Sequence, residues 1–388
     1  MLTQIYNGHI LTPEGWICGG SVLMDGGRIV EIRKGSNIEP KAEKTVDARG
    51  MHVVPGGIEL HCHGGGGRDF MEGTAEAFKV AAQAHMKHGT TAIFPTLSSS
   101  TLKMIEDACA TCDELMKEPG SPIMGLHLEG PYFNPKKAGA QMPEIIRNPD
   151  PKEYKHIVED YSCLRRWDVA PELPGAIEMG RYIVSKGVLA AIGHTAATYD
   201  DVKAAYEAGY SHATHFYNAM PGFHNVREFK HAGTVESVYL MERMTVEMIT
   251  DGIHVPAPIL QLIYRTKGVE RTALITDALA VTASDSKEAF DPRVIIEDGV
   301  CKLSDRSALA GSIATMDRLI RTAVNIAGIP LNDACRMASE TPARIMGIYD
   351  RKGSLQRGKD ADLLLLDDEL NLRSVYAMGQ LVEGTDKM

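Results

Sequence analysis

The chain has 388 residues, of which 44% are hydrophobic and 24% are charged, a composition typical of a soluble globular protein. Its 41 Lys and Arg residues stand against 51 Asp and Glu residues, which gives a formal net charge of -10. That balance argues against a general binder of nucleic acid or of anionic membranes, but it leaves room for a small anionic substrate.

The seven cysteines are scattered along the chain, and their odd number argues against a disulfide framework. We find no signal peptide and no apolar run long enough to span a membrane, so we expect a reduced, cytoplasmic protein. Cys109 and Cys112 form a C-x-x-C pattern on a predicted surface helix. Because no second cysteine pair accompanies them, packing is favoured over a zinc or redox site.

Short strands are predicted near both ends of the chain. Asp25-Gly26-Gly27 separates two apolar runs within residues 1–54, which is typical of a hairpin, and Gly379-Gln380 does the same within residues 354–388. We therefore expect one small β-sandwich domain built from residues 1–54 plus 354–388. Its strands are predicted at 21–24, 28–32, 362–366, 374–378 and 381–383.

Between these ends, residues 55–353 alternate between strand and helix patterns. This α/β alternation favours a (β/α)8 barrel of the TIM type over an open doubly wound sheet. No G-x-G-x-x-G motif opens the first helix, so the sequence gives little support to a dinucleotide-binding fold. The strands are predicted at 57–63, 91–96, 124–129, 168–171, 189–194, 212–218, 245–250 and 273–277, and the helices at 74–88, 101–117, 176–185, 199–208, 256–266 and 315–327.

His61 and His63 form an H-x-H pattern at the end of the first predicted barrel strand. Side chains alternate along a strand, so both rings point to one side, about 7 Å apart along the chain. Cys62 then points to the other side, where we expect it to pack. Alone, H-x-H is weak evidence for a metal site.

Ligand-type side chains recur at the ends of four further strands, as Glu129, His194, His215 and Asp277. Because active sites of TIM barrels gather at the carboxyl ends of the strands, we expect these residues to converge. Core histidines with backbone partners would not explain such a recurrence. Imidazole and carboxylate donors together favour a bound divalent metal.

Longer motifs around these residues resemble the amidohydrolase superfamily, and within it the deacetylases of N-acetylated amino-sugar phosphates. The resemblance extends over nearly the whole chain. The matching motifs are Pro55-Gly-Gly-Ile-Glu-Leu-His-Cys-His63, His127-Leu-Glu-Gly-Pro131, Gly193-His-Thr195, Thr214-His-Phe-Tyr-Asn-Ala-Met220, Asp251-Gly-Ile-His254, Thr276-Asp277, Leu309-Ala-Gly-Ser312 and Gly358-Lys-Asp-Ala-Asp-Leu-Leu364.

The resemblance implies a divalent metal, zinc or iron, held by Glu129, His194 and His215. Some members of this family lack the histidines of the first strand and bind one metal. Here both are present, so His61 and His63 can form a second site that Glu129 bridges. Asp277 is implied as the general acid/base, which takes a proton from the attacking water and later protonates the departing amine. The implied reaction converts N-acetylglucosamine 6-phosphate into glucosamine 6-phosphate and acetate, within amino-sugar catabolism or recycling.

The resemblance also implies a substrate site. Arg227 would pair with the phosphate, to which a guanidinium can donate two parallel hydrogen bonds. In the family this site can borrow residues from a neighbouring subunit, so a homodimer is implied. The family often has a histidine at the position of Gln141, which can donate a hydrogen bond to the substrate carbonyl but carries no charge. The other implied substrate contacts are Ala140, Asn218, Ala219, His254, Leu309, Ala310 and Gly311.

Several alternatives stay open at this point. Cyclic-amide hydrolases of this fold use a lysine at the end of the fourth strand, and residues 168–173 contain none. Deaminases are disfavoured because His215 occupies the sixth strand. A deacetylase of the galactosamine series is a closer rival. A barrel that serves only as an interaction scaffold would be expected to have lost ligands, and all of them are present.

Overall fold

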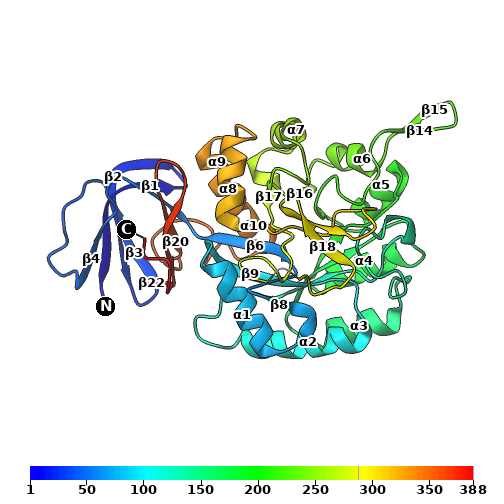
Figure 1. Cartoon of the computed structure of the whole chain (residues 1–388), viewed down its shortest axis with the longest axis horizontal. Coiled ribbons are helices and arrows are strands. Elements are labelled where there is room, and N and C mark those ends of the chain that lie inside the picture. Colours follow the sequence, from blue (N-terminus) through cyan, green and yellow to red (C-terminus); the bar gives the residue numbers. More distant parts are fainter. Residues whose placement is uncertain (287, 388) are drawn as a thin grey trace.

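The structure is a computed structural model, and it describes residues 1–286 and 288–387. Figure 1 shows a small body of strands that contains both termini, beside a larger body in which helices surround a strand barrel. Within the described residues, no helix is both long and apolar enough to cross a membrane. The fold is mixed α/β, as predicted.

The small body is a single eight-stranded sheet of order β22-β21-β20-β5-β1-β2-β3, with β4 paired to β1. The two ends of the chain meet where β5 and β20 pair antiparallel. The sheet has its own hydrophobic cluster, to which Val53 and Leu363 contribute from opposite ends of the chain. Its strands are β1 Thr3–Thr12, β2 Gly15–Asp25, β3 Arg28–Arg33, β4 Lys44–Asp47, β5 His52–Pro55, β20 Leu363–Leu366, β21 Leu372–Ala377 and β22 Gln380–Leu381.

The larger body contains eight parallel strands in the order β17-β16-β13-β12-β11-β10-β9-β6. A parallel bridge between Cys62 and Ala278 brings the first strand beside the eighth, so the barrel nearly closes. The predicted (β/α)8 barrel is confirmed. The domain limits, 1–54 plus 354–388 and 55–353, stay a prediction, and Lys287 and Met388 lie outside the described residues. The barrel strands are β6 Gly57–Cys62, β9 Thr90–Leu97, β10 Leu126–Glu129, β11 Leu164–Val169, β12 Leu189–Ile192, β13 His212–Ala213, β16 Thr245–Met248 and β17 Thr272–Leu274.

All eight strands differ from their predicted bounds, six of them by three residues or fewer at either end, and the two larger differences have physical reasons. β11 begins at Leu164, four residues before the predicted start, because the charged pair Arg165-Arg166 hides the strand pattern. β13 is shorter than predicted because the chain leaves the sheet after Ala213. His215 and Tyr217 adopt positive φ angles of 26° and 79°, which no strand accommodates.

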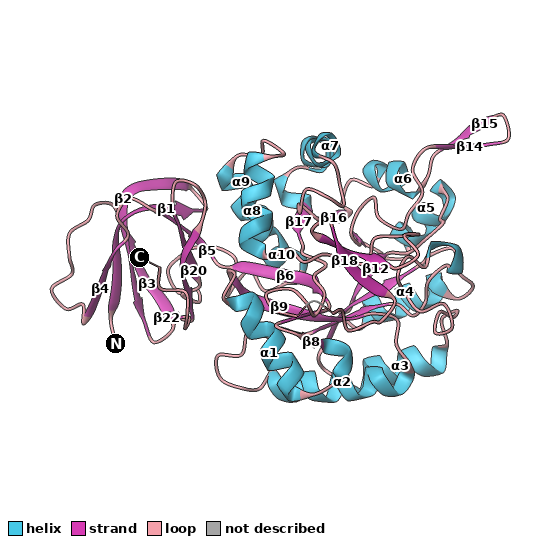
Figure 2. Cartoon of the chain, viewed as in Figure 1, coloured by secondary structure: helices cyan, strands magenta, loops and turns pink. Residues whose placement is uncertain are grey.

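Helices cover the outside of the barrel (Figure 2). A capping box opens α5, where Thr198 and Asp201 bond reciprocally. The helices are α1 Ala75–Met86, α2 Leu102–Leu115, α3 Pro151–Asp160, α4 Ala176–Ser185, α5 Tyr199–Glu207, α6 Thr234–Leu240, α7 Ala257–Lys267, α8 Met316–Asn325, α9 Leu331–Ala338 and α10 Glu340–Ile345; short 3-10 turns are η1 Phe70–Glu72, η2 Pro135–Lys137 and η3 Val269–Arg271. Short paired strands are β7 Gly64–Gly65 with β8 Arg68–Asp69, β14 His224–Val226 with β15 Phe229–His231, and β18 Val294–Glu297 with β19 Val300–Leu303.

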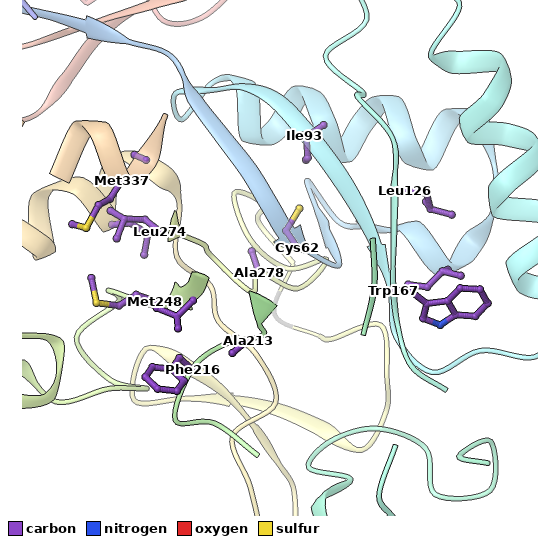
Figure 3. Packing of buried hydrophobic residues seen from close by; sticks show 14 of the residues in the cluster. Cys62, Ile93, Leu126, Trp167, Ala213, Phe216, Met248, Leu274, Ala278 and Met337 are labelled. Carbon is purple, nitrogen blue, oxygen red and sulfur yellow. The ribbon is translucent and has the colours of Figure 1, made fainter. Parts of the chain in front are cut away.

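Side chains of the barrel strands point either outward, toward the surrounding helices, or into the barrel interior. Cys62, Trp167 and Met248 point outward into the hydrophobic cluster between strands and helices (Figure 3). Cys62 therefore packs, as predicted. Because side chains alternate along a strand, the neighbours of these three residues point into the barrel, and several of them are charged.

Candidate metal and substrate site

A pocket of about 530 Å³ opens at the carboxyl ends of the barrel strands. Most of the predicted site residues line it. They are His63, Glu129, Ala140, Gln141, His194, His215, Asn218, Ala219, His254, Asp277, Leu309, Ala310 and Gly311.

Glu129 lies at the centre of a first group of donors. Its Oε1 is 3.0 Å from Nε2 of His194 and 3.0 Å from Nε2 of His215. The two histidine nitrogens are 3.1 Å apart. Nδ1 of His194 donates to the carbonyl oxygen of Lys137 at 2.9 Å, which leaves a lone pair on the Nε2 that faces Glu129. These three residues form one of the groups that could hold a metal ion.

His61 and His63 form a second group around the same carboxylate. Their Nε2 atoms are 3.3 Å apart. Nε2 of His61 is 3.6 Å from Oε1 of Glu129, and Nε2 of His63 is 3.5 Å from Oε2. Nδ1 of His63 is 3.1 Å from Oγ of Ser98. Glu129 thus belongs to both groups, and a bridging position between two ions is geometrically available to it.

The donor set fits a divalent cation. In each histidine pair two ring nitrogens face each other at hydrogen-bond distance, so their lone pairs repel unless a proton or a cation lies between them. Although burial lowers it, the hydrogen bond to Asp277 and the charge of Glu129 raise the pKa of His63 to about 9. Glu129 likewise raises the pKa of His215 to about 9, against the effect of burial. These shifts show a strongly negative field at the site, which favours cations.

Asp277 lies beside the second histidine pair. Its Oδ1 is 3.2 Å from Nε2 of His63 and 3.5 Å from Nε2 of His61. Burial raises the pKa of the Asp277 carboxyl, but His61 and His63 outweigh that effect and lower the pKa below its usual value. The carboxylate is therefore ionised at neutral pH, as a proton acceptor must be.

The backbone at the site is held in an unusual conformation. His194, His215 and Asp277 have φ angles of 46°, 26° and 50°, in the left-handed region that non-glycine residues seldom adopt. Each lies two or three residues after the end of a barrel strand. Such strain persists only where surrounding contacts fix it, and it is concentrated at functional sites.

A third group, His61 with His127 and Asp168, also brings potential metal donors together. Arg166 lies against Asp168, with Nε 2.9 Å from Oδ1 and Nη2 3.0 Å from Oδ2. The guanidinium already neutralises that carboxylate, and Nε2 of His127 pairs with it at 2.9 Å. This group is therefore an internal ion-pair network beneath the pocket.

Comparison with known proteins agrees with this geometry. The sequence model of the amidohydrolase family matches residues 52–382 of the chain. The chain belongs to the amidohydrolase family.

Two curated relatives span almost the whole chain. N-acetylgalactosamine-6-phosphate deacetylase of Escherichia coli O157:H7 is 31% identical over 379 residues, 96% of this chain and 97% of the relative. N-acetylglucosamine-6-phosphate deacetylase of Bacillus subtilis (strain 168) is 30% identical over 379 residues, 96% of this chain and 95% of the relative.

Two solved structures have the same fold over nearly their full length. A mutant of N-acetyl-D-glucosamine-6-phosphate deacetylase from Mycobacterium smegmatis, in complex with N-acetyl-D-glucosamine-6-phosphate, has a TM-score of 0.88 and 32% identity, with 98% of this chain and 99% of that chain covered. N-acetylglucosamine-6-phosphate deacetylase from Pasteurella multocida has a TM-score of 0.92 and 28% identity, with 98% and 99% covered.

Two predicted site residues of this amidohydrolase do not line the pocket. His61 lies just beneath it, fully buried. Arg227 lies on the turn between β14 and β15, with a φ angle of 55°. Figure 1 shows this hairpin projecting away from the barrel. The structure therefore does not bring Arg227 together with the other site residues of the same chain.

Gln141 lines the pocket, but its amide is engaged with Glu129. Nε2 of Gln141 donates to Oε2 of Glu129 at 2.6 Å, and its Oε1 accepts from the backbone N–H of Ser99 at 2.7 Å. Gln141 thus fixes the orientation of the shared carboxylate. Its predicted contact with the substrate carbonyl stays a prediction.

The sequence reasoning missed charged residues that support the site from below, above all Arg166 and Glu247. Both are fully buried inside the barrel. The available signal was a charged residue in the middle of an apolar strand, as in Thr245-Val-Glu-Met248. Their partners lie on other strands and cannot be identified from spacing along the chain.

Proposed function

We propose that this amidohydrolase is a metal-dependent deacetylase that converts N-acetylglucosamine 6-phosphate into glucosamine 6-phosphate and acetate. The observation that carries the proposal is the group of Glu129, His194 and His215 at the strand ends, with Asp277 beside it in one pocket. The Bacillus subtilis relative bears the name of this activity, and the Mycobacterium smegmatis structure holds this sugar phosphate.

When bound, a divalent ion supplies a Lewis acid for the acetyl carbonyl and lowers the pKa of the attacking water. Glu129, His194 and His215 would hold it. Asp277 accepts a proton as the water oxygen attacks the acetyl carbon. It then returns a proton to the sugar nitrogen as the C–N bond breaks, so that acetate and a free amine leave.

We propose zinc or iron as the metal, because one carboxylate with imidazoles suits either ion. A second ion would use His61 and His63 and share Glu129. The hydrogen bond from Gln141 to Oε2 of Glu129 leaves Oε1 free for the group of His194 and His215. We therefore expect this group to bind its ion more tightly than the pair of His61 and His63.

We further propose a homodimer in which the partner's Arg227 reaches the phosphate. The hairpin that carries Arg227 exposes apolar side chains, with Phe223 62% and Phe229 64% accessible. Such side chains on a projecting hairpin suit contact with a second copy. A phosphate contact from Arg227 then requires the partner, because this hairpin lies away from the pocket of its own chain.

A galactosamine-series substrate is the second candidate, since the Escherichia coli relative is named for N-acetylgalactosamine 6-phosphate. Both sugars present the same acetamide and phosphate, and they differ in one hydroxyl orientation.

The deciding experiment measures amine release from N-acetylglucosamine 6-phosphate, N-acetylgalactosamine 6-phosphate and unphosphorylated N-acetylglucosamine, with and without a chelator. We expect the highest kcat/KM with the glucosamine 6-phosphate derivative and loss of turnover on chelation. A preference for the galacto sugar would select the second candidate. No amine release from any of the three by the zinc- or iron-loaded protein would overturn the proposed function.

A further inference from the structure

Three charged residues lie inside the barrel below the pocket, and no part of the mechanism above uses them. Glu247 on β16 and Arg166 and Asp168 on β11 are each 0% exposed. Burying three ionised groups costs several kcal/mol each unless they are paired and hydrogen-bonded. Their contacts therefore decide what the network is for.

Glu247 touches residues from both groups of candidate ligands. Its Oε2 is 3.0 Å from Nδ1 of His61. The same oxygen accepts the backbone N–H of His215 at 2.9 Å. One carboxylate oxygen thus contacts the ring of a ligand in the second group and the main chain of a ligand in the first.

The other oxygen of Glu247 is bonded to Arg166. Arg166 is fixed in turn by Asp168, through two parallel hydrogen bonds of 2.9 and 3.0 Å. Its Nη2 also donates to Oγ1 of Thr214 at 2.9 Å. Asp168 and Thr214 hold the guanidinium in place, and the guanidinium in turn fixes the carboxylate of Glu247 below the candidate ligands.

The contact with His61 settles which of its nitrogens can bind a cation. An Nδ1–H that donates to a carboxylate leaves the lone pair on Nε2, and Nε2 is the atom that faces Glu129 and His63. The contact with His215 acts on the main chain instead. It holds the N–H of a residue whose φ angle of 26° is unfavourable for a histidine.

We propose that Glu247 is a positioning residue for the metal ligands: it fixes the tautomer and direction of His61 and the strained backbone of His215, while Arg166 and Asp168 hold it in place. The inference rests on the proposed function, because it assumes that these histidines bind metal. It predicts that the two groups of ligands depend on one buried carboxylate.

The test replaces Glu247 by Gln in the full-length protein. The amide is nearly isosteric, but it is uncharged and only one of its two terminal atoms is an acceptor. It therefore cannot accept hydrogen bonds from Arg166 on one side and from His61 and His215 on the other. Affinity for Zn²⁺ is measured by competition with a chromophoric chelator, and the ligand field by the visible absorption of the Co²⁺-loaded protein. We expect Zn²⁺ to bind about 10- to 100-fold more weakly and the Co²⁺ bands to shift.

Glu340→Gln is the matched control. Glu340 is also a well-buried carboxylate paired with arginines, Arg336 and Arg344, but it lies on α10 away from the pocket. We expect wild-type Zn²⁺ affinity and Co²⁺ spectrum in this variant. Unchanged affinity and spectrum in folded Glu247→Gln, or equal losses in both variants, would overturn the positioning role.

Should Glu247→Gln fail to fold, Glu247→Asp takes its place. It keeps a charge opposite Arg166 but shortens the side chain by one methylene, so the contact with His61 is lost. Weaker Zn²⁺ binding by this variant supports the proposal, and wild-type affinity overturns it. Wild-type protein that binds Zn²⁺ but releases no amine would refute the proposed function and leave this inference standing.

Discussion

The carboxylate of Asp277 lies 3.2 Å from His63 and faces the pocket, yet it does not belong to the group formed by Glu129, His194 and His215. Its proposed work is proton transfer, so Asp277→Asn should keep metal while losing activity. General acid–base groups contribute about 10²- to 10⁴-fold, and one group that serves both steps belongs near the upper end. We expect a corresponding fall in kcat with metal content near that of the wild type, measured on the same preparation. A loss of less than tenfold would move the proton transfer to another residue.

Substitutions at Glu129 and His63 distinguish the two proposed metal positions. Because Glu129 belongs to both groups of ligands, Glu129→Gln should remove nearly all bound metal. His63→Asn should remove only one ion, so that the metal-to-protein ratio falls from about two to about one and some activity survives. Elemental analysis of the purified variants measures both ratios. A ratio near one in wild-type and His63→Asn protein alike would show that the histidine pair holds no ion.

At the level of single residues, sequence reasoning found donors at strand ends but not the residues that orient them. Glu129 and His194 stand out because imidazoles and carboxylates are unusual at the ends of buried strands. Gln141 lines the pocket, and nothing in the sequence indicated that its amide also bonds to Glu129. Glu247 and Arg166 pair across strands 81 positions apart, and no local pattern encodes such a contact.

At the scale of elements, α1 ends in a buried titratable group. His85 lies in its last turn, 1% exposed, and its Nε2 is 2.8 Å from the carbonyl oxygen of Gly64. Burial lowers the pKa of His85 to about 4. In the unfolded chain a histidine has a pKa of about 6.5, so between these values the unfolded state binds more protons. The stability of the fold therefore falls as the pH drops from 6.5 toward 4.

Replacement of His85 by Gln should remove this part of the pH dependence, because the amide can still donate to Gly64 but does not titrate. Between pH 7 and pH 5 the wild type should lose about 2 kcal/mol more unfolding free energy than the variant. Urea unfolding at the two pH values measures the difference, and other titrating groups cancel in the comparison. Equal losses in both proteins would mean that His85 is already protonated in the folded state at pH 5.

Arg227, on the hairpin β14–β15, is proposed to bind the phosphate of the substrate. A charge-assisted bidentate contact contributes roughly 1.5–3 kcal/mol, so Arg227→Ala should lower kcat/KM for N-acetylglucosamine 6-phosphate about ten- to a hundredfold. The unphosphorylated sugar should be barely affected. Lys230→Ala, which removes another charge from the same hairpin, should leave the ratio between the two sugars unchanged. If Arg227→Ala slowed both sugars equally, the residue would position the hairpin instead of binding phosphate.

Elements with a clear periodicity were predictable, and the exceptions have physical causes. α4 was predicted with its observed bounds, Ala176–Ser185, because apolar positions recur with helical spacing. β11 was predicted too late because Arg166 is buried where a hydrophobic residue was expected. β13 was predicted too long because residues after Ala213 turn into the site with positive φ angles. In both cases the site overrides the local strand pattern.

At the scale of the whole molecule, the chain carries a net charge of -10, and a sugar phosphate must still enter its pocket. Among the described residues, the cationic side chains that line this pocket are Lys136, Lys137 and Arg293. Arg293 is paired with Asp291 at 2.6 Å. Because opposite charges neutralise each other at that distance, Lys136 and Lys137 are the lysine and arginine side chains of the pocket that are left for a dianion. An arginine supplied by a second copy would add a planar donor that bonds a phosphate through two parallel hydrogen bonds, which ties the proposed homodimer to substrate binding.

Mixing two impaired variants tests that arrangement directly. Asp277→Asn lacks the proton-transfer group, and Arg227→Ala lacks the phosphate contact. If the partner's Arg227 completes each site, a mixed dimer contains one site with both residues intact and one with neither. When equal amounts of the two variants exchange subunits freely, half of the dimers are mixed, and each mixed dimer has one complete site out of two. About a quarter of all sites are then complete. Activity that stays at the sum of the two variants, although the subunits are shown to exchange by a tag on one of them, would place Arg227 in the site of its own chain. A rise above the sum of the two variants with the phosphorylated sugar, and no such rise with the unphosphorylated one, would show that the completed contact is the one to the phosphate.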